Sequence, residues 1–155
     1  LGMIAGDGNP SNGKNLSGST LYGVGPDQFA LHPGPSGQPS ILRWTAPAGV
    51  ATSVHVEGQF FAGDIGVMKV AITLNNDWVT KLFQATDAGV FSFDQTVSPG
   101  DTIDFAVYDG FAYGSTPIDA RISYSSPSAV PEPSSLGIAS LLAIGAGVRR
   151  RRHRC

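Results

Sequence analysis

The sequence predicts an all-β fold for most of the chain, an antiparallel β-sandwich of the jelly-roll type. Two observations lead to this prediction. Apolar and polar residues alternate in about seven or eight short runs, and turn-forming residues separate the runs roughly every eight to twelve positions. A period of two is typical of strands that bury one face, and no amphipathic run with a 3.6-residue period is present. An antiparallel sandwich is therefore favoured over a parallel α/β fold.

Glycine and proline interrupt every periodic pattern in residues 6–40. Only residues 28–32 in this stretch are expected to form a strand. Residues 1–27 are therefore predicted to be a loop-rich N-terminal segment, and residues 28–126 the sandwich domain. Residues 1–5 lack the length and the basic region of a secretory signal. We therefore expect this segment to be incomplete, with further sequence upstream of Leu1.

The other strands are expected from residue 41 onward. Their predicted ranges are 41–45, 54–60, 68–74, 78–83, 90–97, 102–108 and 118–124. Residues 75–77 and 98–101 have the composition of tight turns. In the run 102–108 the alternation places Asp104 and Tyr108 on the polar face, opposite the apolar side chains that point into the core.

The charge of the chain is divided unequally between its two parts. The whole sequence has a net charge of −2, but residues 1–129 hold five basic and eleven acidic residues, a net charge of −6. A surface this acidic is a poor match for nucleic acid, whose phosphates require clustered Lys and Arg. No nucleic-acid partner is therefore expected. The single cysteine, Cys155, has no partner for an intrachain disulfide.

Residues 130–155 contain three successive blocks. The first block is Val130, Pro131, Glu132 and Pro133, at the end of a Pro/Ser linker at residues 127–133. Proline fixes φ and removes a backbone donor, which favours an extended segment that an enzyme can bind. An uncharged run at residues 134–148 follows, expected to form a short apolar helix. Residues 149–155 are a basic tail that contains Arg149, Arg150, Arg151 and Arg152.

The apolar run is short for a membrane span. As a helix, residues 136–148 of this run would be about 20 Å long, whereas the hydrocarbon core of a bilayer is about 30 Å thick. Transient association with the membrane is therefore favoured over a permanent anchor. The arginines favour the cytoplasmic side, so the folded domain is expected outside the cell.

These three blocks, in this order, resemble the PEP-CTERM protein-sorting signal. The resemblance implies that exosortase, a membrane-bound processing enzyme, recognises the Pro-Glu-Pro segment while the apolar run holds the chain in the membrane. The arginines at 149–152 would stop transfer. The resemblance thus implies an exported protein that is membrane-associated before processing and lies at the cell surface or in the extracellular matrix afterwards.

Residues 28–124 also look like a β-sandwich domain that is found in secreted bacterial proteins, often with this same tail. The stretches that carry the likeness are residues 29–35, 43–47, 58–66, 100–105 and 118–122. The likeness implies an extracellular domain and brings no catalytic residues with it.

Our leading hypothesis is a non-enzymatic protein of the cell envelope or extracellular matrix. The three histidines are scattered, no G-x-S-x-G motif occurs, and no His- or Cys-rich spacing suggests a metal enzyme. The main alternative is a carbohydrate-binding module for extracellular polysaccharide, because exposed aromatic rings can stack on sugars. The candidate ligand-binding residues are Trp78, Tyr108, Phe111 and Tyr113. A glycan-active hydrolase with paired carboxylates is the third hypothesis.

No cofactor is expected, apart from a structural calcium ion that clustered aspartates would hold. Calcium prefers carboxylate and carbonyl oxygens. The candidate calcium ligands are Asp64, Asp104, Asp109 and Asp119.

Overall fold

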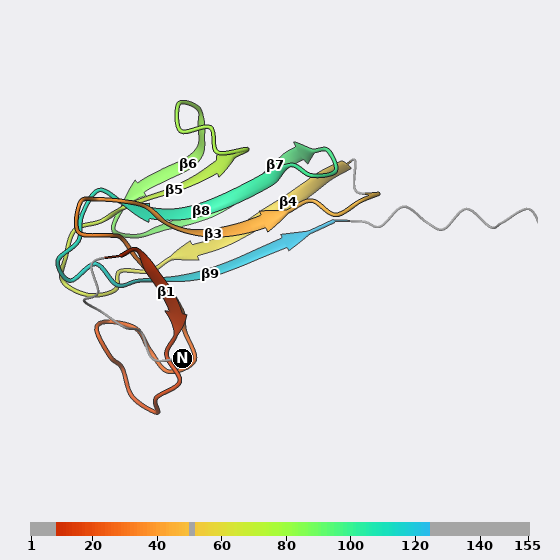
Figure 1. Ribbon diagram of the computed structural model, residues 1–155. Helices are drawn as coiled ribbons and strands as arrows, with labels where there is room; N and C mark the ends of the chain where they lie inside the picture. The colour runs from red at the N-terminus through yellow and green to blue at the C-terminus, as the bar shows by residue number, and fades with distance from the viewer. Residues whose placement is uncertain (1–8, 50–51, 125–155) are drawn as a thin grey trace, which may run out of the picture.

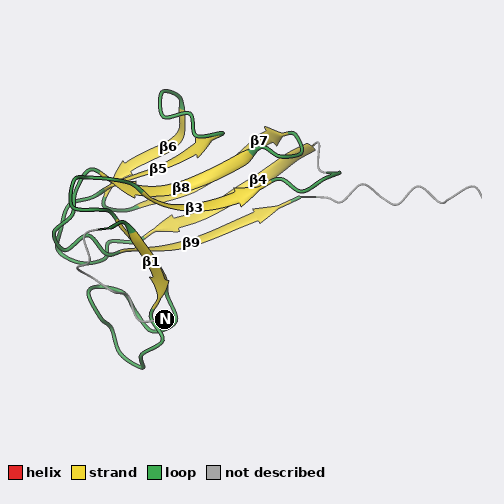
Figure 2. Ribbon diagram, viewed as in Figure 1, coloured by secondary structure: helices red, strands yellow, loops and turns green. Residues whose placement is uncertain are grey.

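The structure is a computed structural model that describes residues 9–49 and 52–124. This part of the chain is all-β and contains nine strands and no helix (Figure 1; Figure 2). The strands are β1 (Ser11–Lys14), β2 (Phe29–His32), β3 (Ser40–Thr45), β4 (Thr52–Phe60), β5 (Lys69–Leu74), β6 (Lys81–Thr86), β7 (Gly89–Val97), β8 (Thr102–Tyr108) and β9 (Thr116–Ser123). The structure therefore confirms the predicted fold class.

The strands form two antiparallel sheets that pack face to face. One sheet has five strands in the order β1-β2-β9-β4-β7, and the other has four in the order β3-β8-β5-β6. Apart from the β5–β6 hairpin, every connection from β2 to β9 crosses from one sheet to the other. This order of eight strands is that of a jelly roll, as the sequence predicts.

The core lies between the sheets and is rich in phenylalanine. Phe60 of β4 stacks on Phe83 of β6 with ring centroids 6.2 Å apart, and Phe91 of β7 contacts Phe105 of β8 at 5.8 Å. Both contacts join one sheet to the other. They follow from the alternation in the sequence, which points every second side chain of each strand inward. The described residues contain no helix that is long and apolar enough to cross a membrane.

Two features of the fold differ from the sequence analysis. The structure adds β1, whose residues Ser11 to Lys14 pair with β2, so the ordered sheet begins upstream of residue 28. The predicted strand at residues 78–83 is too long, because β6 begins only at Lys81. The expected apolar helix at residues 134–148, the sorting motif and the basic tail lie outside the described residues.

The two ends of the sandwich carry different segments. At one end, here called the distal end, the loops at residues 61–68 and 109–115 lie side by side. The backbone N–H groups of Asp64 and Gly66 donate to the carbonyl groups of Ser115 and Tyr113, at 3.0 and 3.1 Å. Strand β9 leaves this end and finishes at the opposite end, here called the tail end, where the described chain stops at Tyr124 (Figure 1).

Candidate ligand-binding face

The outer face of the four-stranded sheet holds three of the five basic residues of residues 1–129. The strand register arranges its side chains in three rows across the sheet. The rows are Lys81, Thr73, Asp104 and Arg43; then Gln84, Ala71, Ala106 and Ile41; then Thr86, Lys69 and Tyr108. In the middle row, the short side chains of Ala71 and Ala106 lie between the longer side chains of Gln84 and Ile41, so the centre of this face is lower than its borders. We call this surface the outer face.

The loop between β5 and β6 folds back so that Trp78 lies on the outer face. Asn75 and Asn76 turn the chain with positive φ angles of 51° and 59°, a conformation that asparagine tolerates better than most residues. The Trp78 indole N–H donates to Asn76 Oδ1 at 2.9 Å, and Lys81 Nζ donates to the Trp78 carbonyl at 2.7 Å. The indole then meets Tyr108 edge to face, with ring centroids 5.2 Å apart. Two of the predicted ligand-binding aromatics are therefore neighbours.

A pocket of about 410 Å³ lies beside this aromatic pair. This volume is within the range of about 300 to 1,000 Å³ that is common for ligand sites. Its lining residues are Lys69, Lys81, Gln84, Ala85, Thr86 and Tyr108. The pocket thus combines an aromatic ring with amide, hydroxyl and ammonium groups that can bind a polar ligand.

The two lysines of the pocket differ in their partners. Lys69 forms an ion pair with Asp109, and this hydrogen-bonded carboxylate raises the pKa of the Lys69 ammonium. Lys81 forms no ion pair with any described residue. Within the described residues, Lys81 donates one hydrogen bond, to the Trp78 carbonyl, which leaves the remaining N–H donors of its ammonium group for a ligand.

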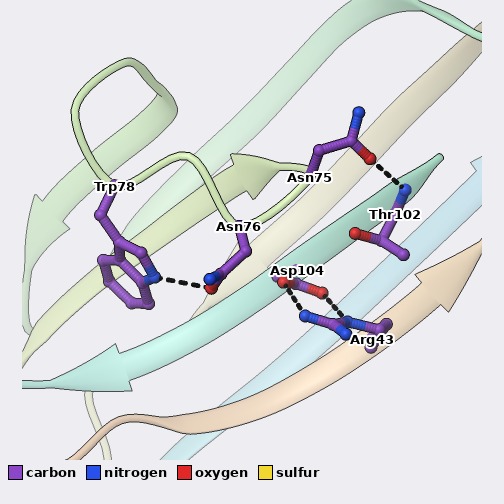
Figure 3. Close-up of polar contacts among 6 residues, drawn as sticks. All are labelled: Arg43, Asn75, Asn76, Trp78, Thr102 and Asp104. Atoms are coloured by element: carbon purple, nitrogen blue, oxygen red, sulfur yellow. Dashed lines mark hydrogen bonds and ion pairs between the residues drawn. The ribbon is translucent and has the colours of Figure 1, made fainter.

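Asp104 is buried, which differs from its predicted place on an exposed polar face. Arg43 binds it through two parallel hydrogen bonds, Nε to Oδ1 and a terminal nitrogen to Oδ2, both 2.7 Å long (Figure 3). These bonds raise the pKa of the Arg43 guanidinium. Thr73, opposite Asp104 in the register, is also buried, and its Oγ1 has no hydrogen-bond partner in the described part of the chain.

The other two candidate aromatics lie in the distal loop at residues 109–115, which follows Tyr108 directly. Phe111 packs edge to face on His32, with centroids 5.3 Å apart. Tyr113 is exposed and has a positive φ of 57°, which is uncommon for a bulky side chain. Ile65 and Val67, in the loop that Tyr113 pairs with, are also exposed. The four predicted aromatics therefore form two separate groups.

The four candidate calcium ligands occupy four different environments. Asp64 accepts a hydrogen bond from the backbone of Ile65, Asp104 is paired with Arg43, Asp109 is paired with Lys69, and Asp119 is on β9 opposite Gln59. Among residues 9–49 and 52–124, no three His, Cys, Asp or Glu side chains are grouped so that they could hold a metal ion. No described cluster supports the calcium prediction.

A polar cluster that the sequence analysis missed lies on the outer face of the five-stranded sheet. His55 Nδ1 is 2.8 Å from Asp94 Oδ1, and Ser92 Oγ is 3.4 Å from His55 Nε2. This is the order of groups in a Ser-His-Asp triad. However, the side chains of His55 and Asp94 are 41% and 73% exposed, and Glu57 Oε2 lies 3.8 Å from the same Nε2. Triads operate where water is excluded, so this arrangement is that of a solvated surface cluster.

The register explains why this cluster is hard to find from the sequence. His55 and Asp94 are far apart along the chain and become neighbours only because β4 pairs with β7 so that these two residues are directly opposite. The cluster could have been found from the sequence only by predicting how β4 and β7 pair. The hollow next to the cluster, about 350 Å³, contains Glu57, Asp119 and Arg121 among its lining residues.

Comparison with known protein families identifies one segment of the chain. A family model described as the PEP-CTERM protein-sorting motif matches residues 129–152. The match covers the Pro-Glu-Pro segment, the apolar run and the first four arginines of the tail. It marks the chain for export and for sorting to the cell surface by exosortase. No curated protein matches the chain.

Proposed function

We propose that this PEP-CTERM sorting-signal protein is a non-enzymatic component of the cell surface or extracellular matrix, and that its jelly-roll domain is what the tail delivers. The observation that carries the proposal is the match at residues 129–152. The domain that precedes the tail is acidic, with a net charge of −6 over residues 1–129, and a net charge far from zero favours the solubility of an exported domain.

The three blocks of the tail have distinct roles in this proposal. Exosortase binds the extended segment Pro131, Glu132, Pro133, the apolar run at residues 134–148 keeps the substrate in the membrane, and the arginines at 149–152 remain on the cytoplasmic side. As a helix, residues 134–148 would be about 22 Å long, which is shorter than the bilayer core of about 30 Å. The run is therefore better suited to hold the chain in the membrane during processing than to anchor it permanently. Cleavage near the motif then releases the domain or transfers it to a surface anchor.

The test is the fate of the protein in cells that produce exosortase. A variant with Pro131→Ala, Glu132→Gln and Pro133→Ala is compared with a control, Ser134→Ala with Ser135→Ala, that changes the adjacent residues. We expect the first variant to keep its tail in intact-mass measurements and to stay in the membrane fraction, and the control to be processed like the wild type. Equal processing of both variants would contradict the proposal.

A second candidate function is that of a carbohydrate-binding module, alone or as part of the first. The specific observation in its favour is the contact between Trp78 and Tyr108 beside a pocket of ligand size. Aromatic rings next to convergent polar groups are the usual features of a small-molecule site. Retention of the protein on immobilised polysaccharide, reduced by Tyr108→Ala and not by Tyr113→Ala, is the expected result.

A further inference from the structure

We propose that the pocket beside Tyr108 and Lys81 binds a carboxylate-bearing sugar unit of an acidic extracellular polysaccharide. This inference rests on the carbohydrate-binding function and names the ligand class of that site. It assigns the ring of Tyr108 to the face of the sugar, Gln84 and Thr86 to its hydroxyl groups, and the Lys81 ammonium to its carboxylate.

The polar groups of the pocket are suited to a sugar. Gln84 and Thr86 are exposed on β6, two residues apart, so they point to the same side of the sheet. The amide and the hydroxyl both donate and accept hydrogen bonds, as the hydroxyl groups of a sugar require. Tyr108 lies across β5 from Thr86 and supplies an apolar ring face with a polar tip.

The charge of the pocket favours binding of an acidic sugar over a neutral one. None of its lining residues is a carboxylate, although residues 1–129 contain eleven acidic residues. Asp109 neutralises Lys69, but Lys81 has no carboxylate partner in residues 9–49 and 52–124. The Asp77 carboxylate, which does not line the pocket, attracts Lys81 electrostatically but forms no ion pair with it. The Lys81 ammonium group, in a pocket without lining carboxylates, therefore attracts a single negative charge on a ligand.

The opposite face of the sandwich provides an internal comparison. The hollow on the five-stranded sheet is of similar size, about 350 Å³, but Glu57 and Asp119 line it together with Arg121. Two carboxylates and one guanidinium give that hollow a negative balance. An acidic polymer should therefore prefer the Lys81 pocket to this hollow.

The test is equilibrium binding to a matched pair of polymers, polygalacturonate and its fully methyl-esterified form, which has the same backbone without the charge. The full chain is used with its five tail arginines changed to glutamine, so that the tail does not bind the acidic polymer by itself. Lys81→Gln removes the charge of the pocket. Arg121→Gln removes the same charge from the other sheet and serves as the matched control. Melting temperatures establish that each variant is folded.

We expect the parent protein to bind polygalacturonate at least fivefold more tightly than the ester. Lys81→Gln should weaken binding to polygalacturonate about tenfold, as expected for the loss of one hydrogen bond to a charged group. It should leave binding to the ester unchanged, while Arg121→Gln should change neither. Equal loss in the two variants would overturn the assignment of the site.

The outcomes also separate this inference from the functions on which it rests. Binding of both polymers with equal affinity, reduced by Tyr108→Ala, would overturn the acidic ligand class and leave the carbohydrate-binding function intact. Binding of neither polymer would overturn both. Neither result bears on processing by exosortase, which is measured in cells from the mass of the mature protein.

Discussion

The buried hydroxyl of Thr73 gives a direct test of how the outer face is packed. The side chain is fully buried, and its Oγ1 has no partner among the described residues. An unsatisfied buried hydroxyl costs about 1 to 3 kcal/mol. Thr73→Val keeps the shape and the β-branching that suit a strand and exchanges the hydroxyl for a methyl group. We expect the variant to raise the free energy of unfolding by about 1 kcal/mol, which corresponds to a rise of about 4 °C in melting temperature for a domain of this size.

The assay is urea unfolding of the full chain at pH 7, followed by the fluorescence of its tryptophans, with the slope of the transition compared between variants. Thr86→Val is the matched control, because Thr86 is exposed on the same face and its substitution should change stability by less than about 0.5 kcal/mol. A loss of 1 kcal/mol or more in Thr73→Val, with an unchanged slope, would refute the reasoning. It would mean that Oγ1 has a hydrogen-bond partner, such as a bound water, that stabilises the fold.

Three further predictions concern other parts of the sandwich. A Cβ atom at Gly63 would lie 1.7 Å from the carbonyl oxygen of Ser115, so Gly63→Ala should destabilise the domain by about 1 to 3 kcal/mol, whereas Gly18→Ala, with open space around it, should not. A backbone N–H and a neighbouring amide lower the pKa of Asp101 below its usual 3.8. The ionised carboxylate therefore stabilises the folded state fully above pH 3.8, and this stabilisation is lost as the pH falls below that value. The melting temperature of Asp101→Asn should consequently depend less on pH in this acidic range than that of the wild type. Ser92→Ala should leave any hydrolysis of p-nitrophenyl acetate unchanged, and a rate that falls at least tenfold would indicate an enzyme.

The alternation of apolar residues predicted most of the fold because it reflects burial on one face. The strands from β2 to β9 follow the predicted runs within a few residues. Strand β1 was missed because its sequence, Ser-Asn-Gly-Lys, has no apolar residue and follows a proline. Its place in the sheet depends on pairing with β2, and pairing leaves no periodic signal in an edge strand of polar residues.

The outer face was harder to predict because alternation identifies the core but not what covers the other side of a sheet. The sequence placed Asp104 on a polar face, and the direction is correct, but the side chain is buried under Arg43 from a neighbouring strand. Trp78 was expected in a strand, yet the turn at Asn75 and Asn76 returns it to Tyr108. Both outcomes depend on cross-strand register, which no local pattern specifies.

The position of the chain exit determines how the tail would present the pocket. The apolar run begins at residue 134, ten residues beyond Tyr124, and ten residues span at most about 36 Å. In the proposed function, the tail end of the sandwich would therefore be the end that lies nearer to the membrane during processing. Strand β8 begins at that end with Thr102 and reaches Tyr108 six residues later, which places the pocket about 20 Å nearer the distal end. An acidic polymer outside the cell would thus reach the pocket before cleavage as well as after it.

The test uses cells that hold the unprocessed Pro131→Ala, Glu132→Gln, Pro133→Ala variant in their membranes. We expect these cells to retain labelled polygalacturonate, and cells that hold the same variant with Lys81→Gln added to retain markedly less. Equal retention would show that the pocket is not presented to the polymer in this way.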